Sequence, residues 1–172
     1  MRKQKGFSLI ELLIVVAIIL IIAAIAIPNL LRSKANANEA GGAGTTRTLI
    51  TASITYSNTY PQAGYPAALT NLGGTPAQCA APNSTNACLV DNVLGCATAT
   101  CAKGSYGYTL TGIGSAAPLT DFVVFASPVS PSAGNRDYCA TSDGVLRGQS
   151  SNGAAPTAPF TTTAACAALS PT

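Results

Sequence analysis

The sequence is 172 residues long and poor in charge, because Asp, Glu, Lys and Arg together make up 9% of it. It contains no histidine, so a Ser-His or Cys-His nucleophile pair is excluded and no enzyme activity is expected. The net charge of +3 arises from nine Lys and Arg against six Asp and Glu, but three of the nine are Arg2, Lys3 and Lys5. The rest of the chain is balanced, so no nucleic-acid site is indicated.

A short basic leader, residues 1–6, precedes a long apolar run. The twenty-one residues 7–27 are apolar apart from Ser8 and Glu11. In a helix they span about 30 Å, the thickness of a bilayer's hydrocarbon core. A carboxylate at the centre of such a helix costs on the order of 3 kcal/mol, so Glu11 indicates a function. The alternative is a carboxylate that only reaches the membrane interface from the helix end.

The leader and the start of the run carry a recognisable motif. No small-x-small cleavage site follows the run, so a secretory signal peptide is not indicated. The stretch Lys5-Gly6-Phe7-Ser8-Leu9-Ile10-Glu11 instead resembles the type IV prepilin processing motif, and the resemblance extends through Pro28 to about Glu39. It implies cleavage between Gly6 and Phe7, N-methylation of Phe7 by the same peptidase, and a role for Glu11 in filament assembly.

Simple electrostatics supports this role for Glu11. Cleavage would give Phe7 a free, positively charged amino group one helical turn away from Glu11. In a bundle of apolar helices, an unpaired buried charge costs several kcal/mol. A neighbouring subunit displaced along the helix axis could pair its Phe7 ammonium with Glu11, so this carboxylate would set the register of the filament.

The apolar helix, residues 7–28, is expected to continue as an amphipathic extension over residues 29–58. Pro28 predicts a kink, because proline removes one helical hydrogen bond. Three glycines interrupt the extension, each costing about 1 kcal/mol in a helix interior; they are Gly41, Gly42 and Gly44. A loop between two helices is the alternative, and we favour one long helix with a weak point.

Residues 59–104 are expected to form a disulfide-rich connecting loop. All six cysteines follow the apolar run, an even number that is typical of disulfides in an oxidising compartment. Fifteen pairings are possible, and we favour Cys79 with Cys88, Cys96 with Cys101, and Cys139 with Cys166. The absence of histidine and of a CxxC motif argues against zinc. Residues 89–94 are expected to add one turn of helix on the core.

Residues 105–148 predict an antiparallel sheet of about four strands. Its strands are expected near residues 106–110, 122–126, 137–141 and 145–147, with a turn at Ser142-Asp143-Gly144. The fold class is therefore α+β, and the resemblance implies a pilin-like arrangement in which the second half of the long helix covers one face of the sheet. Residues 149–172 form a tail rich in Ser, Thr and Pro, which Cys166 would tie to the domain.

The resemblance implies a structural subunit of a type IV pilus, a surface filament for adhesion, twitching motility or DNA uptake. A pseudopilin of a type II secretion system is the alternative, and a singly anchored envelope module is disfavoured by Glu11. The implied partners are other copies of the chain, the prepilin peptidase and methyltransferase, and the inner-membrane assembly machinery. The chain would be anchored in the bacterial inner membrane with its carboxyl-terminal domain in the periplasm, and later be extracellular in the pilus.

Two further sites are weakly indicated, and no cofactor is expected. A calcium site at Asp137 and Asp143 lacks the carboxylate spacing of a calcium loop. The triplet Asn83-Ser84-Thr85 matches a glycosylation sequon, and the threonine-rich tail could carry O-linked sugar.

Overall fold

The computed structural model describes residues 7–151, 160 and 162–172. The chain divides into two compact units, Met1–Lys34 and Ala35–Thr172. The elements in chain order are α1 (Leu9–Thr59), α2 (Leu69–Leu72), the 3₁₀ turn η1 (Gln78–Ala80), β1 (Cys101–Lys103), β2 (Tyr106–Ile113), β3 (Asp121–Pro128), β4 (Arg136–Thr141), β5 (Arg147–Ser150) and α3 (Thr163–Ala167).

The helix α1 is continuous through both positions where the sequence predicts weakness. Pro28 and all three glycines lie inside this one helix. The loop alternative at the glycines is therefore wrong. Gly42 is explained by packing, because a Cβ atom there would lie 2.9 Å from the Tyr106 Cδ1 atom. The predicted kink at Pro28 stays a prediction.

The sheet is an antiparallel meander with the order β1-β2-β3-β4-β5. Sequence analysis predicted about four strands and placed residues 101–103 in the connecting loop, so β1 was missed. This strand has three residues and pairs with β2 across a tight turn at Gly104, whose φ is +63°. The predicted turn at Ser142-Asp143-Gly144 is present, but β5 begins at Arg147 rather than at Val145.

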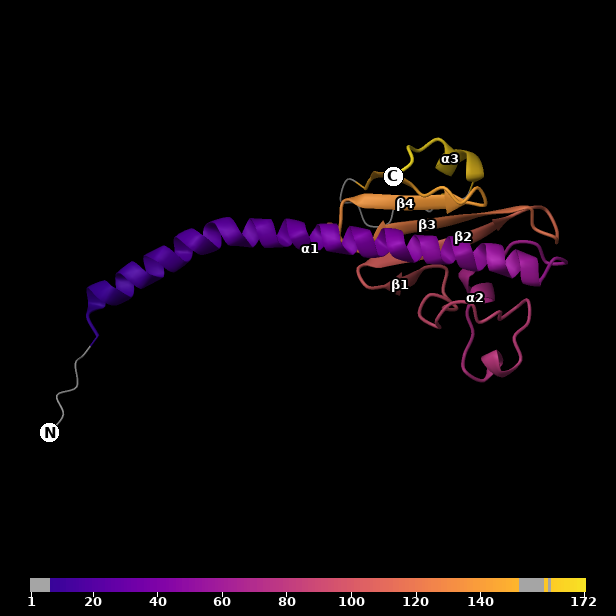
Figure 1. Cartoon of the computed structure of the whole chain (residues 1–172), viewed down its shortest axis with the longest axis horizontal. Coiled ribbons are helices and arrows are strands. Elements are labelled where there is room, and N and C mark those ends of the chain that lie inside the picture. The colour runs from indigo at the N-terminus through magenta and orange to yellow at the C-terminus, as the bar shows by residue number, and fades with distance from the viewer. Residues whose placement is uncertain (1–6, 152–159, 161) are drawn as a thin grey trace. The chain divides into compact units, whose positions relative to one another are not determined.

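The two faces of the sheet pack against different parts of the chain. Alternate residues of β3 serve the two faces: Phe122 and Val124 pack with Leu49 and Tyr56 of α1. Val123 and Phe125 instead form a second cluster with Cys139, Cys166, Phe160 and Leu169. This explains why β3 is apolar without alternation, since a strand buried on both faces has no polar side. Figure 1 shows α3 beside β4 and β3, on the other side of the sheet from the second half of α1.

Two polar contacts help fix the second half of α1 to the domain. Asn38 Nδ2 donates to the Ala133 carbonyl at 2.8 Å, and the Asn135 backbone N–H donates to Glu39 Oε1 at 2.7 Å. The loop before β4 is thereby held against α1. The domain end of the long helix is docked by specific hydrogen bonds in addition to apolar packing.

The segment between α1 and the sheet contains the predicted turn on the core. The apolar patch at residues 89–94 contacts the core through Leu94, which is 2% exposed. The Gly95 backbone N–H donates to the Asp91 carbonyl at 2.9 Å, which is the hydrogen bond of a single helical turn. The Asp91 side chain accepts the Leu94 backbone N–H at 2.9 Å and so closes this turn locally. An Asp side chain that accepts the backbone N–H three residues further on caps the start of a helical turn.

Candidate functional site

The first feature of the candidate site is a long stretch of uncovered apolar surface on α1. In the unit Met1–Lys34, every large apolar side chain from Phe7 to Leu31 is exposed, and Phe7 and Leu9 reach 80% and 79%. Within the described residues, α1 is the one helix long and apolar enough to cross a membrane. A surface of this extent is unfavourable in water and calls for lipid or another protein around it.

The second feature is Glu11, the one acidic residue in the first turn of α1. Its Oε2 atom accepts the backbone N–H of Ser8 at 3.0 Å, so the carboxylate satisfies a donor that the helix start leaves unpaired. Ser8 and Glu11 have the spacing of a capping box, Ser-x-x-Glu. A negative charge there also interacts favourably with the helix dipole.

This local bond was missed by sequence analysis, although the signal was present. The pattern Ser8-Leu9-Ile10-Glu11 is the sequence signature of a helix start. The structure thus gives Glu11 a partner within its own chain before any assembly. Of the two residues that flank the predicted cut, Phe7 is described and exposed, whereas Gly6 lies outside the described residues.

Comparison with known proteins addresses this amino-terminal segment directly. Residues 1–27 match the family described as the prokaryotic N-terminal methylation motif. The amino-terminal segment is thus similar to that of type IV pilins and pseudopilins. A similar protein is the type IV wide pilus major component PilA4 of Thermus thermophilus, which is 64% identical over 39 residues. No solved structure matches the chain significantly.

The likeness to this pilin covers a limited part of both proteins. The aligned stretch is 23% of this chain and 30% of the relative. The α+β architecture extends the pilin-like character beyond it, since a long apolar amino-terminal helix continues into a domain with an antiparallel sheet. The comparisons thus support a pilin-like amino-terminal segment, and the choice between a pilus and a secretion filament is a matter for proposal.

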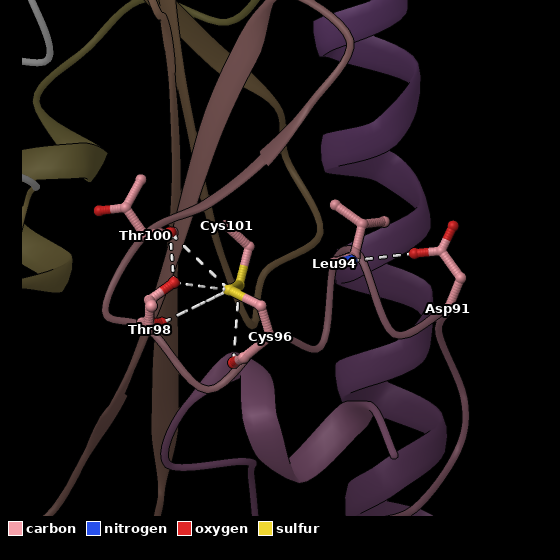
Figure 2. The surroundings of a disulfide bond; sticks show 6 residues. All are labelled: Asp91, Leu94, Cys96, Thr98, Thr100 and Cys101. Carbon is pink, nitrogen blue, oxygen red and sulfur yellow. Dashed lines mark hydrogen bonds between the residues drawn. A yellow bond between two sulfur atoms is a disulfide. The ribbon is translucent and has the colours of Figure 1, made fainter. Parts of the chain in front are cut away.

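The cysteines form three disulfides among the described residues. The bonded pairs are Cys79–Cys88, Cys96–Cys101 and Cys139–Cys166, the same pairs that the sequence analysis favoured. Figure 2 shows the second bond with Thr98 and Thr100 beside it. The Cys96 sulfur lies 2.9 Å from the Thr98 hydroxyl, which itself donates to the Thr100 carbonyl at 2.8 Å. Two of the bridges therefore close short loops, with sequence separations of 9 and 5, whereas Cys139–Cys166 lies in the buried cluster on the second face of the sheet.

The aspartate side chains described below form hydrogen bonds and ion pairs within the domain. Asp137 is buried in β4, where its Oδ2 atom accepts from Gln149 at 3.4 Å. Asp143 pairs with Arg147 at 2.6 Å, and that guanidinium lowers the pKa of Asp143 to about 2. The hydrogen bond from Lys103 likewise lowers the pKa of Asp91. No group of three or more potential metal ligands occurs in the part of the chain that the structure describes.

The tyrosines under the helix belong to the core. Burial raises the pKa of Tyr106, with further contributions from Tyr138 and Glu39. The Tyr106 hydroxyl donates to the Arg136 carbonyl at 2.9 Å, so its polar end is satisfied. These rings therefore contribute to packing, and the amino-terminal segment remains the candidate functional site.

Proposed function

We propose that this protein is a structural subunit of a type IV pilus. The observation that carries the proposal is the uncovered apolar half of α1, which bears a single carboxylate, Glu11, one turn after the proposed cleavage point. An anchor alone needs no such carboxylate, because the charge opposes insertion. A helix that passes from the bilayer into a bundle of identical helices can use it.

The proposed life of the subunit has two stages. In the first, α1 spans the inner membrane with residues 1–6 in the cytoplasm and the domain outside. The three basic residues of the leader support this orientation, although Arg32 and Lys34 follow the apolar run. The three disulfides support it independently, since such bonds persist in oxidising compartments.

In the second stage the prepilin peptidase cuts between Gly6 and Phe7 and methylates Phe7. The assembly machinery then withdraws the subunit from lipid, and the apolar side chains of α1 pack against those of neighbouring copies. Burying one Leu or Ile side chain is worth about 1.5 to 3 kcal/mol, so a run of this length holds a filament together strongly. Glu11 then meets the Phe7 ammonium of a neighbour and fixes the axial register.

The test is to shear filaments from the surface of the producing cells, image them, and measure the mass of their subunits. We expect this chain in the filaments, beginning with N-methylated Phe7. A subunit that retains Met1 or Arg2 contradicts the processing step. If the chain stays in the envelope and its deletion abolishes protein secretion while surface filaments persist, the protein is a secretion pseudopilin instead.

A further inference from the structure

An exposed turn on the domain carries the one Asn-x-Ser/Thr triplet in the 172-residue sequence, Asn83-Ser84-Thr85. Asn83 and Thr85 are exposed, and Ser84 between them is half-buried. The turn lies within the loop closed by the Cys79–Cys88 disulfide, and Asn83 and Asn86 form an isolated antiparallel bridge across it. The triplet is therefore presented on a closed, hydrogen-bonded turn at the surface.

The middle residue of the triplet is fixed to the core. The Ser84 carbonyl accepts the Tyr56 hydroxyl at 2.6 Å and the Asn71 side-chain amide at 3.1 Å. Tyr56 is 2% exposed and belongs to the packed face of α1. This anchoring holds the turn in place while its outer residues face solvent.

The carboxamide of Asn83 is oriented by three donors. Its Oδ1 atom accepts the Thr85 hydroxyl at 2.6 Å, the Thr85 backbone N–H at 2.8 Å and the Asn86 backbone N–H at 3.2 Å. Among the described residues, none accepts a hydrogen bond from the Asn83 Nδ2 atom, whose two N–H groups are donors. Donors on Oδ1 also stabilise the negative charge that develops on the amide when Nδ2 loses a proton.

We infer that Asn83 is the acceptor of an N-linked glycan. The co-reactant is an oligosaccharide joined through pyrophosphate to a polyisoprenoid lipid. The Nδ2 atom forms a bond to the anomeric carbon of the first sugar, and the bond from that carbon to the pyrophosphate oxygen breaks. The lipid pyrophosphate leaves with the electron pair, and one Nδ2 proton passes to a base of the transferase.

The surface beside the turn has room for such a group. A hollow of about 350 Å³ opens there, and Ser84 and Thr85 form part of its wall with Tyr65 and Asn71. A sugar attached at Asn83 displaces no packed side chain, because Asn83 itself is exposed. A glycan at this point adds bulk and solubility to the domain surface.

The experiment is peptide and intact-mass analysis of the full protein from the cells that naturally produce it. We expect a mass excess equal to a whole number of sugar residues, located on the peptide that contains Asn83. Asn83→Gln and Thr85→Val should each remove that excess completely, because the first lacks the acceptor geometry and the second lacks the hydroxyl. Thr85→Ser and Ser84→Ala should retain it, since both keep an intact triplet and the Ser84 backbone carbonyl.

An unmodified Asn83 peptide overturns the inference, and so does a sugar that persists in Asn83→Gln. The inference rests on the exterior placement in the proposed function but not on filament assembly. The same mass measurement reads the oxidation state of Cys79 and Cys88. Oxidised cysteines with an unmodified Asn83 would therefore refute the glycan while leaving the exterior placement intact.

Discussion

Glu11 has one partner in the single chain and a different proposed partner in the assembled filament. In the single chain it accepts the Ser8 backbone N–H at 3.0 Å and caps its own helix. In a filament it would face the charged amino group that cleavage creates at Phe7 of a neighbour. The local bond uses one carboxylate oxygen, so the second oxygen can accept from the neighbour's ammonium group. The same bond would hold the Glu11 side chain near the start of the helix, close to where that ammonium group would lie in the filament.

Replacing Glu11 separates these two roles. Glu11→Gln keeps an acceptor for the Ser8 backbone N–H, because glutamine also serves in a capping box, but it removes the charge. Glu11→Ala removes both. We expect both variants to accumulate in the membrane at or above the normal level, since losing the charge favours insertion by about 1 to 3 kcal/mol. Both should yield no surface filaments, as measured by shearing and microscopy.

The matched control is Ser8→Ala, which leaves the backbone donor and the Glu11 charge in place and should assemble normally. The informative outcome is that of Glu11→Gln. Normal filaments from that variant would mean that Glu11 acts as a helix cap and not as the register charge.

Asp143 gives a prediction for the folded domain. Its pKa is lowered to about 2 by the Arg147 guanidinium, so the folded state favours the carboxylate more than the unfolded state does. The stabilisation is present above the ordinary pKa of about 4 and is lost as the pH falls towards 2. Because the Asp143 side chain is 41% exposed, the contribution at neutral pH is modest, about 1 kcal/mol or less.

Asp143→Asn should therefore lower the unfolding free energy slightly at pH 7 and leave it unchanged at pH 2. The Asn side chain can still accept from the Thr141 hydroxyl and the Val145 backbone N–H, which bind Oδ1 at 2.9 and 3.0 Å. Urea unfolding of a soluble fragment of residues 35–172 at several pH values measures this. A difference that does not shrink on acidification would place its cause outside the ion pair.

At the scale of elements, the three glycines of α1 stand in different surroundings. Gly42 is buried against the Tyr106 ring, whereas a Cβ atom at Gly41 or Gly44 would meet nothing within 4 Å. The Tyr106 ring cannot move away freely, because its hydroxyl is bonded to the Arg136 carbonyl. One glycine therefore permits close packing, and the other two only weaken the helix.

Alanine at these positions should act in opposite directions. Gly41→Ala and Gly44→Ala should each raise the unfolding free energy of the fragment by about 0.5 to 1 kcal/mol, through helix propensity alone. Gly42→Ala should lower it by about 1 to 3 kcal/mol, since it overpacks a tight contact. Urea unfolding measures all three, and a stabilised Gly42→Ala would show that Tyr106 yields easily.

The elements that were predictable are those with a strong local pattern. Composition and hydrophobic periodicity predict the apolar run, the strands β2 and β3, and the turn at Ser142-Asp143-Gly144. The strand β1 was missed because Cys101–Lys103 has too few residues for an alternating pattern, although Gly104-Ser105 is a hairpin signal. The single helical turn predicted within residues 89–94 is present, since the Gly95 backbone N–H bonds to the Asp91 carbonyl.

The candidate site was predictable because its chemistry lies in one continuous stretch of sequence. Phe7, Glu11 and Pro28 can be read without knowing the fold. The contacts that join α1 to the domain could not be predicted in the same way. Asn38 and Glu39 bind the loop at Ala133 and Asn135, about a hundred residues further along the chain, and no local pattern indicates such a pairing.

At the scale of the whole molecule, the disulfides differ in what they join. Cys79–Cys88 and Cys96–Cys101 close loops of 9 and 5 residues within the connecting region. Cys139–Cys166 has a sequence separation of 27 and links β4 to α3. It is the bridge that ties the carboxyl-terminal segment to the second face of the sheet, where Phe125 meets Phe160 edge to face with centroids 5.3 Å apart.

Removing the longest bridge should therefore cost the most. On the loop-entropy model, closing 27 residues contributes about 3.5 kcal/mol, against about 2.6 kcal/mol for the 9-residue loop of the matched control. The variant Cys139→Ala with Cys166→Ala also loosens Phe160 and Leu169, which pack on the buried face of β3. We expect its unfolding free energy to fall by more than that of Cys79→Ala with Cys88→Ala, as measured by urea unfolding of the fragment.

Proteolysis gives the second readout of this prediction. In the Cys139 and Cys166 variant, limited digestion should cut first within the segment 162–172, because its five-residue helix is too short to be stable without its tertiary contacts. The Cys79 and Cys88 variant should keep that segment protected. Equal protection in both variants would mean that the apolar contacts of Phe160 and Leu169 hold the segment without the disulfide, and that the second face of the sheet is closed by packing alone.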